Sequence, residues 1–217
     1  MYKQRNLSKG EKMNIKRFVL GYLDSNSYLV YEGKEAMLID VGGYNIEKII
    51  SFLEKNDLEL KKVLLTHGHY DHIAGINKLF NYNKKIKVYI GREDLAFLKD
   101  SNLNLSFLID QTDFKITDGI KIIPIVENDI INKFKVIDTP GHTIGSKSFY
   151  NEKEKILFSG DTLFRMSFGR TDFPTGNRND LKRSLNILNK LPEDVVVYSG
   201  HGMKTLIKSE KNLEKKV

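Results

Sequence analysis

The feature that most limits what this chain can fold into is a run of three histidines and one aspartate within six residues. His67, His69, Asp71 and His72 directly follow a short apolar stretch. His67 and His69 are two residues apart, so in extended chain their side chains point to the same side. Imidazole and carboxylate groups together suit Zn²⁺, Fe or Mn²⁺. We therefore expect four ligand groups to converge on a metal at this point of the chain.

The backbone expected around this cluster is a strand that ends at Thr66 and a helix that begins at Asp71. Gly68 allows a tight turn between the first two histidines. Aspartate is a favoured helix N-cap residue, and the apolar residues that follow have helical spacing over residues 71–80. One isolated histidine would ordinarily be read as a packed or surface residue. Three histidines and an aspartate at this spacing indicate a site.

Three further polar residues follow the same rule later in the chain. His142 follows a β-rich run and a Pro-Gly turn, Asp161 follows residues 156–159, and His201 follows residues 195–199. Each alone could be an ordinary turn residue. Together they follow one pattern, because each lies in a loop directly after a strand. A rigid scaffold commonly positions catalytic ligands in such loops.

The rest of the chain alternates short β-rich runs with amphipathic helical stretches, which predicts layered α/β structure. We expect strands over residues 18–23, 27–31, 36–40, 62–66, 87–90, 121–125, 134–138, 148–150, 156–159 and 195–199, and helices over residues 45–56, 71–80, 92–99 and 179–191.

The 217 residues are enough for one full-sized domain, and no low-complexity linker divides them. The patterned sequence begins at Met13, which could be an alternative start. We therefore expect residues 1–12 to be a flexible N-terminal extension and residues 13–217 to form a single domain. No apolar run approaches the ~18 residues of a membrane span, and no secretory signal is evident. With no cysteine in the chain, disulfides and thiolate ligands are excluded and a cytoplasmic location is expected.

The net charge of +7 is a property of the two ends of the chain. Residues 1–17 carry +5 and residues 202–217 carry +3, whereas the residues between them sum to −1. A nucleic-acid-binding protein would concentrate its charge on one folded face. We therefore expect solvated ends, with no nucleic-acid partner and no membrane partner.

The whole pattern resembles the metallo-β-lactamase superfamily. The motif His-x-His-x-Asp-His, followed by a later His, Asp and His, is complete here, and the resemblance covers roughly residues 14–205. It implies a four-layer αββα sandwich with two metals at one edge, between two sheets. By this resemblance His67, His69 and His142 would bind the first metal, Asp71, His72 and His201 the second, and Asp161 would bridge both.

The implied cofactors are two divalent metal ions, with zinc expected first and iron or manganese as alternatives. Two such ions can clamp a water and the scissile group, and can lower the pKa of that water to about 7. The catalytic residues implied are Asp161 and Asp71. Asp71 could orient the nucleophile or pass on a proton, in addition to its role as a ligand. Asp40 matches the superfamily's early aspartate and would support the ligands from behind. An ordinary turn aspartate is the alternative interpretation of Asp40.

Residues 160–174 resemble the glyoxalase II-type hydroxyacylglutathione hydrolases, especially their short bacterial form. In this stretch Arg170 and Asp172 are expected to pair and brace a tight loop; direct contact of Arg170 with an anionic substrate is the alternative. Full-length members carry a C-terminal helical region that holds glutathione, whereas only 16 residues follow His201 here. The expected substrate is therefore a small-molecule thioester, with its thiol left open.

Other activities on the same fold are less favoured. A mononuclear iron persulfide dioxygenase, using His67, His142 and Asp161, is the main alternative, because the Gly-Arg-Thr-Asp segment also occurs there. A nuclease is disfavoured by the near-neutral body of the chain. A β-lactamase is disfavoured by Asp161, the lack of cysteine and the lack of an export signal. A non-catalytic binding protein would be expected to lose ligands. The oligomeric state is left open.

Overall fold

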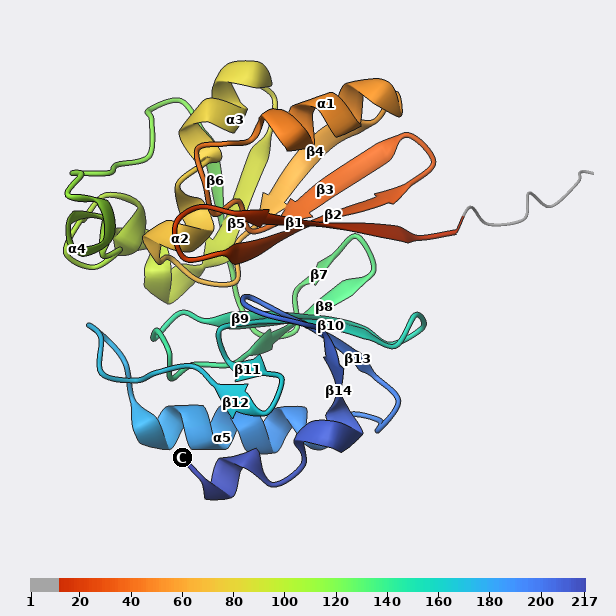
Figure 1. Ribbon diagram of the computed structural model, residues 1–217, viewed down its shortest axis with the longest axis vertical. Helices are drawn as coiled ribbons and strands as arrows, with labels where there is room; N and C mark the ends of the chain where they lie inside the picture. The colour runs from red at the N-terminus through yellow and green to blue at the C-terminus, as the bar shows by residue number, and fades with distance from the viewer. Residues whose placement is uncertain (1–11) are drawn as a thin grey trace, which may run out of the picture.

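The computed structural model describes residues 12–217 and contains two six-stranded sheets that lie face to face (Figure 1). The predicted extension over residues 1–12 lies almost wholly outside the described residues, so that extension and the single-domain boundary at residue 13 stay predictions. The first sheet, in spatial order, consists of β1 (Asn14–Leu20), β2 (Ser25–Glu32), β3 (Glu35–Ile39), β4 (Glu59–Leu64), β5 (Lys87–Gly91) and β6 (Lys121–Ile125).

The first sheet is antiparallel from β1 to β3 and parallel from β3 to β6. The second sheet has the order β14-β13-β10-β9-β8-β7, with one parallel pair, between β10 and β13. Its strands are β7 (Ile130–Ile131), β8 (Phe134–Asp138), β9 (Lys147–Asn151), β10 (Ile156–Gly160), β13 (Val196–Ser199) and β14 (Thr205–Leu206), and a separate small ribbon pairs β11 (Leu163–Phe164) with β12 (Ser167–Phe168).

Helices cover the outer faces of both sheets, so the molecule has four layers (Figure 1). α1 and α3 lie on the first sheet, and α5 lies on the second. This arrangement confirms the predicted αββα sandwich. The helices are α1 (Glu47–Lys55), α2 (Tyr70–Ile73), α3 (Ile76–Tyr82), α4 (Ser106–Asp110) and α5 (Arg178–Leu188), with 3-10 turns η1 (Arg92–Leu98), η2 (Ile207–Glu210) and η3 (Leu213–Lys215).

Three buried apolar clusters fill the three spaces between the four layers, and the alternation of side chains along each strand assigns them. On β3, Leu38 points toward α1 and α3, whereas Met37 and Ile39 point toward the second sheet. On β10, Phe158 joins the central cluster and Leu157 packs toward α5. Because successive strand residues face opposite sides, a strand covered on both faces must be apolar at nearly every position.

The first strand differs from the prediction of residues 18–23, because β1 spans Asn14–Leu20 and the chain then turns. Gly21 causes the turn: it has φ +72°, and a Cβ there would lie 2.5 Å from the carbonyl oxygen of Gly42. Only glycine fits a left-handed position that is approached so closely by other backbone.

The helix predicted over residues 71–80 is divided into α2 and α3. The N–H of Gly75 donates to the carbonyl of Val41, 2.9 Å away, and not to the carbonyl four residues earlier. That earlier carbonyl, of Asp71, accepts from the hydroxyl of Ser25 at 2.5 Å. Both groups of the missing helical bond are therefore satisfied by the first sheet. The helix predicted over residues 92–99 is likewise a 3-10 turn, η1.

The ends of several strands meet at one edge of the sandwich. Asp40 follows β3, Asp161 follows β10, and His201 lies two residues after β13. In open α/β sheets the carboxyl ends of the strands are where ligands bind. None of the helices over residues 12–217 is long and apolar enough to cross a membrane.

Candidate metal centre

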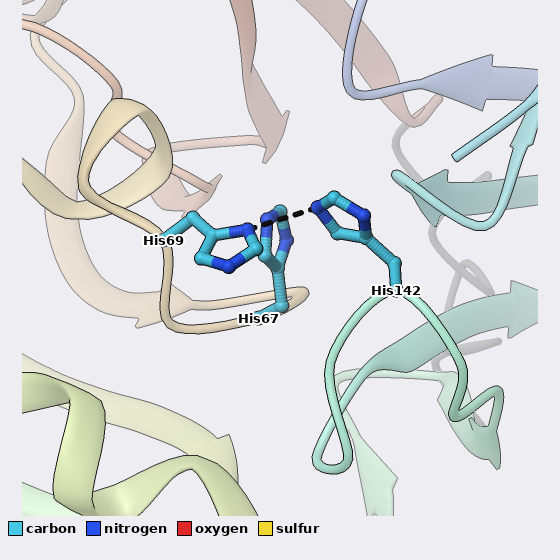
Figure 2. A group of neighbouring side chains, drawn as sticks. All are labelled: His67, His69 and His142. Atoms are coloured by element: carbon cyan, nitrogen blue, oxygen red, sulfur yellow. Dashed lines mark hydrogen bonds between the residues drawn. The ribbon is translucent and has the colours of Figure 1, made fainter. Parts of the chain in front are cut away.

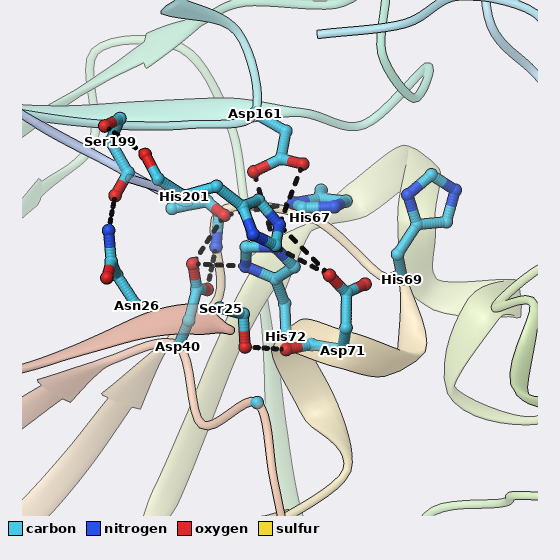
Figure 3. Close-up of polar contacts among 12 residues, drawn as sticks. Ser25, Asn26, Asp40, His67, His69, Asp71, His72, Asp161, Ser199 and His201 are labelled. Atoms are coloured by element: carbon cyan, nitrogen blue, oxygen red, sulfur yellow. Dashed lines mark hydrogen bonds and ion pairs between the residues drawn. The ribbon is translucent and has the colours of Figure 1, made fainter. Parts of the chain in front are cut away.

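The structure brings all seven predicted ligand side chains together at this edge, between the two sheets (Figures 2 and 3). They form three overlapping groups, and within each group the candidate ligand atoms lie within 4.8 Å of one another. The groups are His67 with His69 and His142, His67 with His72 and Asp161, and Asp71 with His72 and His201.

The first group consists of three imidazoles that face one another (Figure 2). Nδ1 of His69 and Nε2 of His142 are 2.9 Å apart. The other nitrogen of His142, Nδ1, donates to the carbonyl of Arg170 at 2.8 Å, so in the neutral ring Nε2 carries a lone pair. Two nitrogens held this way must share a proton or a cation. Nε2 of His67 is buried beside them with no hydrogen-bond partner.

The second group contains a carboxylate and is more open. Nε2 of His201 lies 3.1 Å from Oδ2 of Asp71, and Nε2 of His72 lies 3.5 Å from the same oxygen. Nδ1 of His201 donates to the carbonyl of Leu23 at 3.0 Å, which turns Nε2 toward the centre. The side chain of His201 is 27% exposed, whereas that of His72 is fully buried.

Asp71 does not cap its helix as predicted. α2 begins at Tyr70, with His69 at the N-cap position and no side-chain capping bond. The carboxylate of Asp71 points toward His72 and His201 (Figure 3), because these imidazoles hold it in the centre.

Asp161 lies between the two groups. Its Oδ1 is 3.3 Å from Nε2 of His72, and its Oδ2 is 3.6 Å from Nε2 of His142 and 3.5 Å from Nε2 of His201. Oδ1 is buried and makes no hydrogen bond. A buried carboxylate oxygen without a hydrogen-bond partner is unusual in a native protein, and a cation would satisfy it. The geometry therefore gives Asp161 contacts on both sides of the centre.

Asp40 supports ligands of both groups from behind. Its Oδ2 accepts from Nδ1 of His72 at 2.9 Å and from the hydroxyl of Thr66 at 2.7 Å. That hydroxyl in turn accepts from Nδ1 of His67 at 3.1 Å. The backbone N–H of Thr66 also donates to Oδ1 of Asp40, at 2.7 Å. Outer-shell carboxylates of this kind fix the tautomer and orientation of imidazole ligands.

The electrostatics separate the two groups. Burial, with a smaller contribution from the nearby His142, lowers the pKa of His69 to about 3. Burial, together with the neighbouring imidazoles, also holds the pKa of His67 well below its usual range. Both rings are therefore neutral at ordinary pH. A neutral ring has the lone pair that a metal requires.

The second group is charged. Burial opposes ionisation of Asp161, but His72 and the other imidazoles outweigh burial and hold the pKa of this carboxyl well below its usual range. The same balance, again led by His72, lowers the pKa of Asp71. Burial of His72 is outweighed in turn by the carboxylates of Asp71, Asp161 and Asp40, which raise its pKa.

Arg170 and Asp172 form the predicted pair. Nε and one terminal nitrogen of Arg170 donate to the two carboxylate oxygens of Asp172, each at 2.6 Å. The guanidinium carbon also lies 4.0 Å from the ring centre of Phe173. Because the carbonyl of Arg170 accepts from His142, this pair braces the loop that orients one predicted ligand.

Sequence reasoning missed Asp94, a fully buried carboxylate in η1. It accepts from the N–H of Gly68 at 3.0 Å, from the N–H of Gly145 at 2.7 Å and from the hydroxyl of Thr143 at 2.7 Å. It therefore ties the loop of His67 and His69 to the loop of His142. Asp94 lies three residues after β5, inside the stretch predicted as a helix over residues 92–99, so no local signal marked it.

The loop that carries His201 is held by the first sheet, which the sequence also did not reveal. The side-chain amide of Asn26 donates to the carbonyls of Ser199 at 2.8 Å and Gly202 at 3.1 Å (Figure 3). The hydroxyl of Tyr28 donates to the same carbonyl of Ser199 at 2.7 Å. A Cβ on Gly200 would lie 2.0 Å from Oδ1 of Asp161, so this close approach requires glycine.

A cavity of about 350 Å³ opens in front of the centre. Its floor is polar and contains Asp71, Asp161 and His201, whereas apolar side chains form most of its walls. A mainly apolar pocket with a few convergent polar groups is the usual form of a small-molecule site. The apolar walls are Leu23, Leu105, Ile109, Phe164, Phe168 and Phe173.

The comparisons with known proteins agree with this geometry. The family model of the metallo-beta-lactamase superfamily matches residues 20–201. A hydroxyacylglutathione hydrolase from Haemophilus influenzae, GloC, is 33% identical over 212 residues, which cover 92% of this chain and 95% of the relative.

Two similar crystal structures have a TM-score of 0.84. The BLEG-1 B3 metallo-beta-lactamase is 36% identical and covers 91% of this chain and 96% of its own; TTHA1623, in a di-iron-bound form, is 31% identical and covers 93% and 100%. The chain therefore belongs to the metallo-beta-lactamase superfamily, and within it this protein is a metallo-hydrolase.

Proposed function

We propose that this metallo-hydrolase holds two divalent cations and hydrolyses small-molecule thioesters. The observation that carries the proposal is the position of Asp161 between two groups of candidate ligands. The first cation would be held by His67, His69 and His142, and the second by Asp71, His72 and His201. Zinc suits imidazole and carboxylate ligands, and iron is supported by the di-iron relative.

Two features of the described side chains support bound cations without reference to the family. Nε2 of His67 and Oδ1 of Asp161 are buried inside the cluster without a hydrogen bond. Leaving a buried polar atom unpaired costs roughly 1–3 kcal/mol, so an ion between them would remove two such costs. Four rings also have their outward nitrogen fixed by a protein acceptor, as ligating histidines do: His67 by Thr66, His72 by Asp40, His142 by Arg170 and His201 by Leu23.

Paired divalent cations supply an ionisable water and polarise a carbonyl oxygen when they are bound. The chain's own residues do the remaining work. Asp71 lines the cavity, where its carboxylate can orient a water. The apolar walls exclude bulk water from the carbonyl and favour an uncharged ester group over a charged one.

The thioester assignment is supported by the name of the Haemophilus influenzae relative, a hydroxyacylglutathione hydrolase. It is also supported by the cavity, because soft, apolar sulfur and acyl groups suit walls of Phe164, Phe168 and Phe173. A thiolate is a good leaving group, so the reaction needs no strong acid at the departing atom.

The test is elemental analysis of purified protein combined with a thioester panel that includes S-lactoylglutathione and coenzyme A esters. We expect about two metals per chain, thioester turnover with Zn²⁺ and loss of turnover with a chelator. One iron per chain, with oxygen uptake on a persulfide, would replace this proposal by the persulfide dioxygenase alternative.

A second candidate is β-lactam hydrolysis, favoured by the 36% identity to a B3 metallo-beta-lactamase. Cleavage of a chromogenic cephalosporin by the same metal-loaded protein tests it directly. Thioester turnover with no cephalosporin cleavage would exclude it, and the reverse result would make it the primary function.

A further inference from the structure

A second hollow, of about 370 Å³, adjoins the cavity in front of the metal centre. Leu23, Asp71 and Ile109 line both spaces, so the two adjoin, and we call them together the groove. One end of this groove is the carboxylate of Asp71, and the other end is Lys48, in the first turn of α1. The metallo-hydrolase site explains the first space but gives no role to the second.

The second hollow has apolar walls and a single cationic group. The turn between β1 and β2 contributes Tyr22, which is 79% exposed, and Leu23, which is 49% exposed. Tyr44 and Ile109 lie across from them in the lining. Side chains this exposed and this apolar are rarely left uncovered in one hollow unless they receive something.

The wall formed by α4 is fixed in place by one carboxylate. Oδ2 of Asp110 accepts from the hydroxyl of Tyr44 at 3.1 Å and from the hydroxyl of Tyr70 at 3.0 Å. This three-way contact joins α4 to α2 and to the loop before α1, so the groove is already formed. The carboxylate of Asp110 is therefore engaged by two hydroxyl groups of the wall.

Lys48 is the group in this groove that can select a ligand by charge. Within residues 12–217 no carboxylate lies within ion-pair distance of its ammonium group. Arg170 also lines the groove, but its guanidinium already donates to both carboxylate oxygens of Asp172. A negative charge on the substrate therefore fits beside Lys48, the cation of the groove that has no carboxylate partner among the described residues.

We propose that this groove binds one arm of the substrate, an apolar chain that ends in a carboxylate paired with Lys48. This inference rests on the proposed thioester hydrolysis and narrows its substrate class. One lysine supplies a single compact positive charge, which matches the single negative charge of a carboxylate. The carboxylate can belong to the acyl group or to the thiol, and the two sources share the same recognition chemistry.

Two substrate series distinguish these sources. The first consists of N-acetylcysteamine thioesters of succinate, glutarate and adipate, each compared with its methyl ester. The second consists of acetyl thioesters of 3-mercaptopropionate and 6-mercaptohexanoate, each compared with its amide. We expect kcat/KM to favour the free acid in one series by about fivefold, the size of one exposed ion pair.

Lys48→Gln should reduce this preference for the acid to about one, and Lys48→Arg should retain it because the charge is kept. The matched control is Lys55→Gln, at the other end of the same helix and outside the groove, which should leave the preference unchanged. A preference that survives Lys48→Gln, or no preference in either series while neutral thioesters are cleaved, would overturn the inference and leave the proposed function standing.

A binding measurement tests the carboxylate site separately from the proposed thioester hydrolysis. The matching thioethers lack the carbonyl and cannot be cleaved, so NMR titration of the acid and amide forms measures binding alone. If no thioester is hydrolysed, the proposed function fails. Acid-selective binding that Lys48→Gln abolishes would then still support a carboxylate site, and equal binding of both forms would overturn it.

Discussion

The two groups of candidate ligands differ in burial and in charge, although they share Asp161. His67, His69 and His142 form a buried, nitrogen-only group, and two of its imidazoles have a lowered pKa. The group around Asp71 and His72 includes a carboxylate and is partly open at His201. The first group is thus prepared for a cation before one arrives, whereas the second is stabilised by its own ion pairs.

Two adjoining groups of candidate ligands can therefore differ in whether a proton must leave before a cation binds. A cation that enters the neutral group displaces no proton from His67 or His69. A cation that enters the charged group must displace protons that the carboxylates hold on His72 and His201. We therefore expect the first group to fill first and the second to depend more strongly on pH.

The largest expected effect is that of Asp161→Ala, because it removes the contact common to both groups. Loss of a partner outside the ligand shell already costs about 10–100-fold in metal affinity or activity, so kcat/KM should fall by more than about 100-fold. Metal content per chain should fall as well, as measured by elemental analysis. Full activity in this variant would contradict the bridging position.

His69→Ala and His201→Ala separate the two groups. Each should reduce the metal content from about two to about one per chain, because each leaves the opposite set of ligands intact. The remaining ion should be held tightly in His201→Ala and weakly in His69→Ala, as judged by competition with a chelator. Unchanged metal content in His69→Ala would remove this residue from the ligand set.

Asp40→Ala and Asp94→Ala compare a carboxylate that supports both groups of candidate ligands with one that supports only the first. Asp40 orients ligands of both groups, whereas Asp94 ties together only the loops of the first. We expect Asp40→Ala to weaken both metals by about 10–100-fold, and Asp94→Ala to weaken the first metal more than the second. Chelator titrations of the two variants check this. Equal weakening of both metals by Asp94→Ala would refute the assignment of Asp94 to the first group.

The smallest expected effect is the pH dependence of the metal-free protein. The pKa of His72 and that of His201 are raised despite burial, because nearby carboxylates favour the protonated rings. Their stabilisation is fully present below the ordinary histidine pKa of 6.5 and is lost as the pH rises through the raised values. The Tm of chelator-treated protein should therefore fall as the pH is raised above neutrality, and that of the metal-loaded protein should fall less. His72→Gln should flatten the difference, and a flat metal-free curve in the unmodified protein would count against the charged group.

How far the sequence could predict this site depends on the range of the interactions involved. The seven candidate ligand side chains were predictable because four of them are clustered within six residues and the other three follow the ends of strands, and both are local patterns. Asp94 was missed because its partners, Gly68, Thr143 and Gly145, come from distant loops. The groove toward Lys48 was missed for the same reason, because its walls come from β1, α1 and α4.

The sequence by itself determined the layered architecture, since strand and helix periodicity are set by neighbours along the chain. It also determined which side chains could bind a metal. Only the tertiary structure decided where the helix over residues 71–80 breaks, because Val41 and Ser25 take over the hydrogen bonds that would have continued it. It likewise decided that Asp71 faces His201 and does not cap α2. A local pattern assigns each backbone group its default partner, and the fold replaces that partner wherever a distant group lies closer or carries the opposite charge.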